Sequence, residues 1–304
     1  MAEFGYFTLV LVSCSMLSLV GCLFIIVLYL LTPDLDALIN RQVFFLALSD
    51  LIMSLGYLLT PWTYNLDPAS DSLLCQTQAI LLSFSRKTSI FISFLIYYSI
   101  YLVIVDLYPR LEKQIQIQGF IDEVEDVKYL LSRKIYILTA ISFSIALIIT
   151  PLPLFTDDYG PIEQGWCFLK MQNTYVDYIW MLVQFQGFFI MFILCCVYFQ
   201  FRIFAVISKV KREKGQIQMY EQVKKKLIWY PIFLVLCFLP VFSNRLVQKI
   251  IEVQYDYEMA RCIVGAICSL NGFVNMMVFG ISGGFFERLC SASEEDLSSP
   301  LLTN

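Results

Sequence analysis

The sequence contains no histidine, and only 15% of its 304 residues are charged. Without histidine the chain cannot build the histidine clusters that hold catalytic zinc, and it has no imidazole for acid–base catalysis. We therefore expect a protein that is not an enzyme and has no metal or cofactor. Soluble domains carry about 25% charged residues, whereas this chain has a mean hydropathy of +0.71. So apolar a chain is expected to have the lipid bilayer as its main solvent.

Long hydrophobic runs dominate the chain. A span needs about 20 residues, because the hydrocarbon layer is about 30 Å thick and a helix rises about 1.5 Å per residue. We predict an all-α, polytopic membrane protein whose residues 1–290 form a seven-transmembrane helix bundle with a short membrane-parallel C-terminal helix, followed by a disordered cytoplasmic tail, 291–304. The seven predicted spans are 5–31, 43–62, 74–107, 135–155, 178–206, 227–249 and 259–281.

The basic residues predict which side is cytoplasmic, because cytoplasmic loops carry an excess of Lys and Arg. With the N-terminus outside, fifteen of the 21 basic residues are cytoplasmic, three are external, and Arg86, Lys87 and Arg245 fall within spans. We predict a multi-pass protein of the plasma membrane with its N-terminus outside. No basic residue precedes the first run, so we expect a span there rather than a cleaved signal peptide.

The cytoplasmic segments allow more than one interpretation. Apolar residues at helical spacing in 108–134 indicate either an amphipathic helix at the membrane interface or an extension of a neighbouring span. The basic third loop either follows from the charge bias and contacts lipid headgroups, or forms a docking surface for a signalling partner. Cys290, next to the last span, is a candidate for palmitoylation.

Ten cysteines are present, and six of them fall within spans, where small buried apolar residues are expected. Cys75 and Cys167 lie on the external side, at the start of the third span and in the loop after the fourth. A disulfide between them would hold that loop over the mouth of the bundle. Cys262 is a competing partner, and we favour the Cys75–Cys167 bond.

Several short motifs accompany the seven spans. They are Cys75-Gln-Thr-Gln78, Trp166-Cys167, Tyr230-Pro231, Cys237-Phe-Leu-Pro240, Asn244-Arg245-Leu246, Asn271-Gly-Phe-Val-Asn275 and Phe279-Gly280. Together they resemble the G-protein-coupled receptor superfamily, and most closely its cyclic-AMP receptor-like (class E) family. The resemblance implies a signal transducer that binds an extracellular small-molecule ligand and activates a heterotrimeric G protein. No nucleic acid is expected among its partners.

Some receptor motifs are missing. Rhodopsin-like receptors carry Asp-Arg-Tyr near the position of Ile100, and Asn-Pro-x-x-Tyr in the seventh span; neither motif occurs here. These departures argue against the rhodopsin-like class. A retinal protein needs a Schiff-base lysine in the seventh span, and residues 259–281 contain no lysine. That absence excludes an opsin or a retinal proton pump.

Polar residues inside the bilayer mark the candidate switch. Arg86 lies eleven residues after Cys75, about 16 Å into the membrane, and a charge at such depth needs a partner. We predict a buried cluster of Asp50, Arg86, Asn271 and Asn275. Arg86 either pairs with Asp50, which we favour, or forms the floor of a pocket for an anionic ligand.

Other residues receive roles from their predicted positions. Pro231 and Pro240 would kink the sixth span into a hinge, although prolines are also tolerated in membrane helices. Gln78, Lys87, Trp166 and Arg245 are candidates for facing the ligand in the outer half of the bundle. The candidates for facing the G protein are Lys209, Lys211, Arg212, Lys224 and Lys225.

A small-solute transporter with seven helices is the alternative function. Transporters usually show internal repeats and interrupted helices in corresponding halves. We find no convincing repeat, and an odd number of spans argues mildly against one. The receptor interpretation is therefore preferred.

Overall fold

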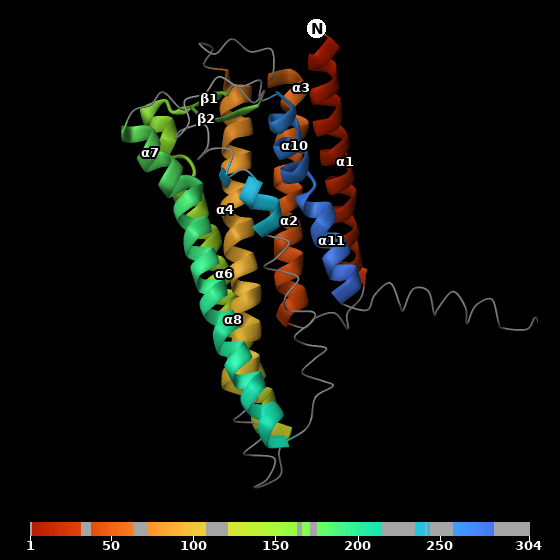
Figure 1. Ribbon diagram of the computed structural model, residues 1–304, viewed down its shortest axis with the longest axis vertical. Coiled ribbons are helices and arrows are strands. Elements are labelled where there is room, and N and C mark those ends of the chain that lie inside the picture. The colour runs from red at the N-terminus through yellow and green to blue at the C-terminus, as the bar shows by residue number, and fades with distance from the viewer. Residues whose placement is uncertain are drawn as a thin grey trace, which may run out of the picture.

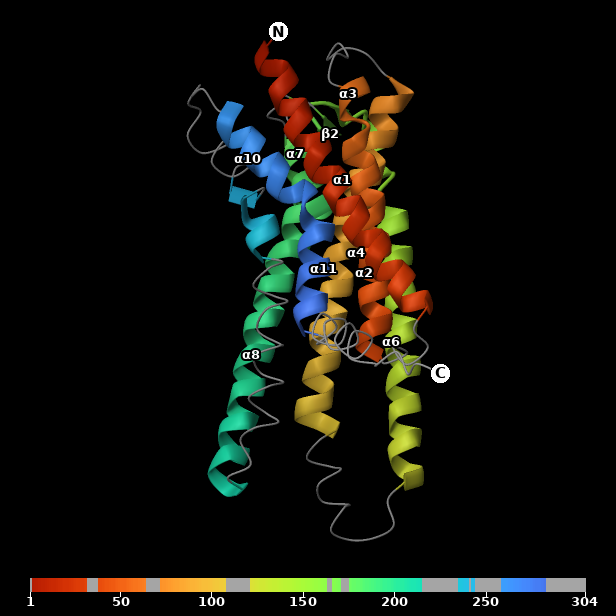
Figure 2. The same cartoon turned by 90° about the vertical axis from the view of Figure 1, so that its right-hand side faces the viewer.

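A computed structural model describes residues 2–31, 38–63, 72–107, 121–162, 166–170, 175–214, 235–240, 242–243 and 258–282. The long helices run side by side in an elongated bundle (Figure 1; Figure 2 gives the view turned by 90°). The first half of the chain forms α1 (Ala2–Leu31), α2 (Leu38–Leu58), α3 (Thr60–Thr63), α4 (Leu73–Tyr101), the π-helical turn η2 (Leu102–Leu107) and α6 (Ile121–Ile149). The second half forms η3 (Leu152–Thr156), β1 (Tyr159–Pro161), β2 (Cys167–Leu169), α7 (Tyr175–Met181), η4 (Leu182–Gln186), α8 (Gly187–Lys214), α10 (Glu258–Ser269) and α11 (Asn271–Ser282).

Five helices in the described residues are long and apolar enough to cross a membrane, and a bent pair raises the number to six. They correspond to the predicted spans one to five and seven. The predicted sixth span, 227–249, lies largely outside the described residues, which include helical turns at 235–240 and 242–243. The predicted C-terminal helix and the tail also lie outside the described residues.

The long third, fourth and fifth spans continue beyond the bilayer-sized segment. α4 runs into η2 without a gap, and α8 extends to Lys214. α6 begins at Ile121, so the apolar pattern of the second cytoplasmic loop belongs to an extension of the fourth span rather than to a separate interfacial helix. At its other end α6 stops before Pro151, whose ring and missing N–H do not fit a helix interior.

The seventh span is bent by 49° between α10 and α11, a feature that the apolar pattern does not predict. At the bend the Gly272 N–H donates a hydrogen bond of 2.9 Å to the Ser18 Oγ of α1. A side chain that takes part in the backbone hydrogen bonding of a helix is a known cause of a kink. A Cβ at position 272 would overlap Cys22 Sγ and lie 2.6 Å from Ser18 Oγ, so glycine permits this close contact between α1 and α11.

A small hairpin closes the end of the bundle where the N-terminus lies (Figure 1). β1 and β2 are antiparallel, with Tyr159 opposite Leu169 and Pro161 opposite Cys167. The hairpin begins after Asp157, which has a left-handed backbone (φ 54°) and an ion pair of 3.3 Å with Lys170. All three residues of β2 are buried, so the hairpin is part of the core rather than a loose loop.

Candidate functional site

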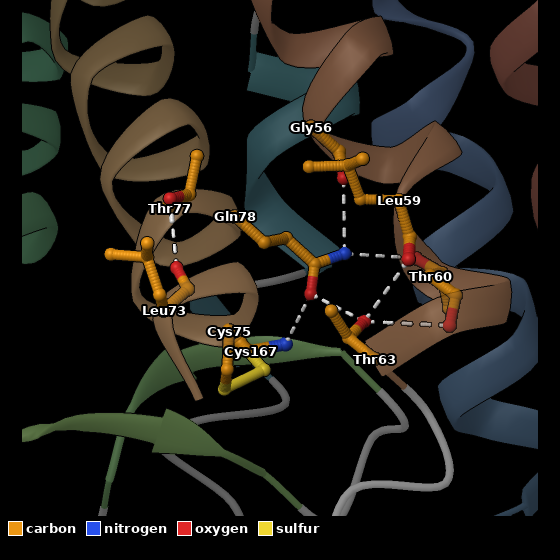
Figure 3. Close-up of a disulfide and its surroundings, with 9 residues drawn as sticks. All are labelled: Gly56, Leu59, Thr60, Thr63, Leu73, Cys75, Thr77, Gln78 and Cys167. Atoms are coloured by element: carbon orange, nitrogen blue, oxygen red, sulfur yellow. Dashed lines mark hydrogen bonds between the residues drawn. A yellow bond between two sulfur atoms is a disulfide. The ribbon is translucent and has the colours of Figure 1, made fainter. Parts of the chain in front are cut away.

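The outer hairpin is attached to α4 by a disulfide between Cys75 and Cys167, whose Cα atoms are 5.2 Å apart. The described cysteines within the spans are free thiols, as expected of small buried residues. Figure 3 shows the disulfide next to the Gln78 side chain, one turn further along α4. The structure therefore holds β2 against the third span at the position expected from the two external cysteines.

Gln78, a candidate for facing the ligand, is buried among protein partners on both sides of its amide. Its Oε1 accepts hydrogen bonds from Thr63 Oγ1 and from the Cys167 N–H, both 2.8 Å long. Its Nε2 donates to the Gly56 carbonyl (3.0 Å) and to Thr60 Oγ1 (3.1 Å). These bonds, visible in Figure 3, use the hydrogen-bonding capacity of a buried amide. Gln78 is thus a structural residue that connects α2, α3 and α4 to the hairpin.

The predicted ion pair between Arg86 and Asp50 is wrong. Arg86 Nη2 donates a hydrogen bond of 2.6 Å to the Tyr57 hydroxyl, and its guanidinium carbon lies 4.4 Å from the ring centroid of Phe168. Tyr57 follows Asp50 by seven residues on α2, about 10 Å along the axis. The long Arg86 side chain therefore reaches outward to Tyr57, away from Asp50. Its Nε is buried without a hydrogen-bond partner.

Asp50 forms the centre of a buried polar cluster with Ser89, Asn271 and Asn275. Its Oδ1 accepts bonds from Ser89 Oγ (2.6 Å) and Asn271 Nδ2 (2.8 Å), and its Oδ2 accepts one from Asn275 Nδ2 (2.6 Å). Three helices, α2, α4 and α11, are joined in this way. The two asparagines reach one carboxylate because residues four apart share a helix face. The cluster thus contains three of the four predicted members and replaces Arg86 with Ser89.

Ser89 was missed because serine in an apolar helix commonly bonds to its own backbone. One signal was available in the sequence, since Ser89 is three residues after Arg86 and so lies on the same face of α4, one turn deeper. A buried carboxylate that accepts three short hydrogen bonds has its hydrogen-bonding needs met by neutral partners. That arrangement explains how a buried anion is accommodated here with no basic residue among its hydrogen-bond donors.

Lys87 points away from Arg86, as expected for adjacent residues on a helix. Its side chain is completely buried, and Nζ donates a hydrogen bond to Gln184 Oε1 of η4. The Gln184 amide in turn donates to the Ile149 carbonyl at the end of α6, at 2.8 Å. Lys87 therefore has a neutral partner that is itself held in place by a neighbouring span.

Trp166 is buried at the outer end of the bundle, where it had been expected to face a ligand. Its ring stacks on Phe7 of α1 with centroids 6.2 Å apart, and meets the Tyr57 ring edge-on at 5.7 Å. The indole N–H has no hydrogen-bond partner. Trp166 thus lies at the outer end of the bundle, close to Phe168, whose ring lies over the Arg86 guanidinium.

The inner half of the bundle contains a second contact zone that the sequence did not predict. Tyr101 of α4 stacks on Phe199 of α8 with centroids 4.7 Å apart, and the Tyr97 hydroxyl bonds to Gln200. On the α2 side, Ser99 Oγ lies 3.1 Å from Gln42 Oε1. Neutral side chains therefore connect the third span to its neighbours next to Ile100.

For the remaining predicted site residues, the structure gives at most the position along a helix. Pro240 is the last residue of the helical stretch described at 235–240, and the hinge stays a prediction. Lys209, Lys211 and Arg212 lie on α8, at the end remote from the hairpin (Figure 1). Pro231, Arg245, Lys224, Lys225 and Cys290 lie outside the described residues.

Comparison with known proteins identifies the fold. No protein-family model matches the chain, and no curated protein matches it. Among solved structures 774 chains match, and one of them is the crystal structure of squid rhodopsin. The match has a TM-score of 0.68 and 14% sequence identity, and covers 98% of this chain and 87% of that chain. The chain therefore has the fold of squid rhodopsin, an all-α bundle of membrane spans.

Proposed function

We propose that the protein is a G-protein-coupled receptor of the plasma membrane, with its N-terminus outside. In this proposal a small-molecule ligand binds in the outer half of the bundle, and movement of the sixth span activates a heterotrimeric G protein. The observation that carries the proposal is the receptor-like fold combined with a disulfide-held hairpin over one end of the bundle. Within this proposal, the short sequence motifs favour a receptor of the cyclic-AMP receptor-like family.

The Asp50 cluster provides a physical route from the outer half to the inner half. Asn271 is the first residue of α11, directly after the bend of the seventh span. A ligand that shifts α10 against α4 changes the position of Asn271 and so alters its bond to Asp50. The ligand shifts the balance between an inactive and an active arrangement of the helices only if it binds these two arrangements with different affinity.

The test is a guanine-nucleotide exchange assay with the purified full chain in lipid nanodiscs. We expect accelerated exchange on at least one class of heterotrimeric G protein when a panel of small metabolites, cyclic nucleotides included, is added. The D50N variant should keep the fold and change the response, because its amide cannot accept all three donors. Solute accumulation in vesicles without any exchange would instead support the transporter alternative and contradict the proposal.

A further inference from the structure

Two basic side chains in the outer half of the bundle lack a counter-charge. Arg86 is 2% exposed and Lys87 is 0% exposed, and both belong to the outer half of the span Leu73–Val105. Neither forms an ion pair with a carboxylate in the described part of the chain. A buried charge without a counter-ion is unfavourable, and in membrane proteins it usually marks a functional site.

The partners that these cations do have are neutral. Arg86 bonds to the hydroxyl of Tyr57 and leaves Nε without a partner, while Lys87 bonds to the amide of Gln184. Asp50 forms no ion pair with either residue in the described chain, and its oxygens accept from Ser89, Asn271 and Asn275 instead. The described chain therefore gives the two cations neutral hydrogen-bond partners but no carboxylate within ion-pair distance.

The surroundings of Arg86 are aromatic. The rings of Tyr57 and Phe168 lie 5.9 Å and 4.4 Å from the guanidinium carbon, and the Trp166 ring packs against Tyr57. The Trp166 indole N–H is a second buried donor without a partner. Aromatic rings of this kind favour a ligand with an apolar part, whereas an inorganic ion would make no contact with them.

We infer that the ligand is a small organic molecule with one oxyanion group, which binds directly at Arg86 while its apolar body lies against Tyr57, Phe168 and Trp166. Lys87 strengthens the positive field from the adjacent position. The inference rests on the proposed receptor function. A single negative charge is specified because the segments predicted to be external carry nine acidic residues, which repel a polyanion. They are Asp67, Asp71, Asp157, Asp158, Glu163, Asp177, Glu252, Asp256 and Glu258.

The first test measures the melting temperature of the purified full chain in nanodiscs. The probes are 4-phenylbutyrate, benzenesulfonate, the neutral 4-phenylbutanamide, and chloride alone. We expect the two organic anions to raise the melting temperature of the wild type and the amide and chloride to leave it unchanged. In R86M the affinity for the anions should fall by about thirtyfold or more, while the exposed-site variant R202Q keeps the wild-type shift. An equal shift from the amide or from chloride, or none from either organic anion, would overturn the inference.

The second test needs no ligand. If Arg86 is an uncompensated charge, R86M should melt at a higher temperature than the wild type when no anion is present. Q184E places a carboxylate on Lys87, and we expect this ion pair to outweigh the lost hydrogen bond to the Ile149 carbonyl. Q184E should therefore also stabilise the empty chain and weaken the anion-induced shift. Q186E is the matched control, because Gln186 lies in the same buried turn and has no basic partner in the described residues; it should destabilise.

Destabilisation by both R86M and Q184E would show that the two cations are structural and would overturn the inference, whichever probes bind. Should R86M fail to fold, the opposite signs expected for Q184E and Q186E still decide the question. None of these measurements contains a G protein. Anion binding can therefore fail while nucleotide exchange is observed, and exchange can fail while anion binding is observed, so the two proposals are tested separately.

Discussion

Ser89 on α4 donates a hydrogen bond of 2.6 Å to Asp50 on α2, and this bond defines how the second and third spans are aligned in depth. With Ser89 level with Asp50, the Arg86 side chain is level with Tyr57 instead. The same alignment places Gln78 beside Thr60 and Thr63 of α3, which directly follows the outer end of α2. The depth alignment set by the Ser89–Asp50 bond thus agrees with the contacts of Arg86 and Gln78.

Double-mutant cycles should separate true partners of Asp50 from apparent ones. We expect a coupling energy of about 0.5–3 kcal/mol between D50N and S89A, because the two residues are in contact, and less than about 0.5 kcal/mol between D50N and R86Q. Chemical or thermal unfolding of the purified variants gives both values. A large coupling between D50N and R86Q would restore the ion pair that the structure rejects.

Replacement of Gln78 by leucine should loosen the outer hairpin. Q78L leaves the Cys167 N–H without its partner and removes the bonds to Thr60 and Thr63, and a buried polar group left unsatisfied costs about 1–3 kcal/mol. We expect a lower melting temperature and faster proteolysis of the hairpin. The control is T77V, since Thr77 is exposed and bonds only to the Leu73 carbonyl. If both variants behave alike, Gln78 does not hold the hairpin.

A methyl group at Gly272 should separate α1 from α11. The new Cβ would overlap Cys22 Sγ and lie 2.6 Å from Ser18 Oγ, and such overpacking costs about 1–3 kcal/mol. G272A should therefore melt at a lower temperature, with partial recovery in C22A/G272A. At Gly265 an added Cβ meets only side-chain atoms, the nearest at 3.1 Å, so G265A should be milder. Equal losses in G272A and G265A would contradict this account.

The predicted orientation can be tested by glycosylation. A sequon added before residue 6 should be glycosylated in cells, and one added within the basic segment 215–226 should not. The physical reason is that lysine-rich loops remain in the cytoplasm during insertion. Glycosylation of the segment 215–226, or of both sites, would contradict an external N-terminus and the proposed signalling to a cytoplasmic partner.

Several features of the site could be predicted because they follow from local position. Asp50, Asn271 and Asn275 were brought together by depth and by helical periodicity alone, and the structure joins them by hydrogen bonds. Cys75 and Cys167 were paired because both belong to the external side, and the structure contains that disulfide. Depth in a membrane is a nearly one-dimensional coordinate, so residue counting locates it well.

The partners of Gln78 and Arg86 could not be predicted in this way. Both depend on how far α2 is displaced along its axis against α4, and on where the hairpin enters the bundle. A displacement of one or two turns leaves the apolar pattern of each helix unchanged but exchanges its polar contacts. The 49° bend of the seventh span is equally hidden from sequence, because it involves a bond between Gly272 and a serine 254 residues away.

The sequence by itself determined that this chain is a bundle of membrane spans, since too little charge and long apolar runs leave no other solvent than lipid. It also determined which residues are costly in that solvent. Only the tertiary structure decided how these residues are accommodated. Asp50 accepts hydrogen bonds from three neutral donors, and Gln78 bonds to the hairpin. Arg86 and Lys87 have neutral partners and no counter-charge in the described chain. The reason is that hydrophobicity sets the depth of a residue, whereas the alignment and rotation of packed helices select its partner.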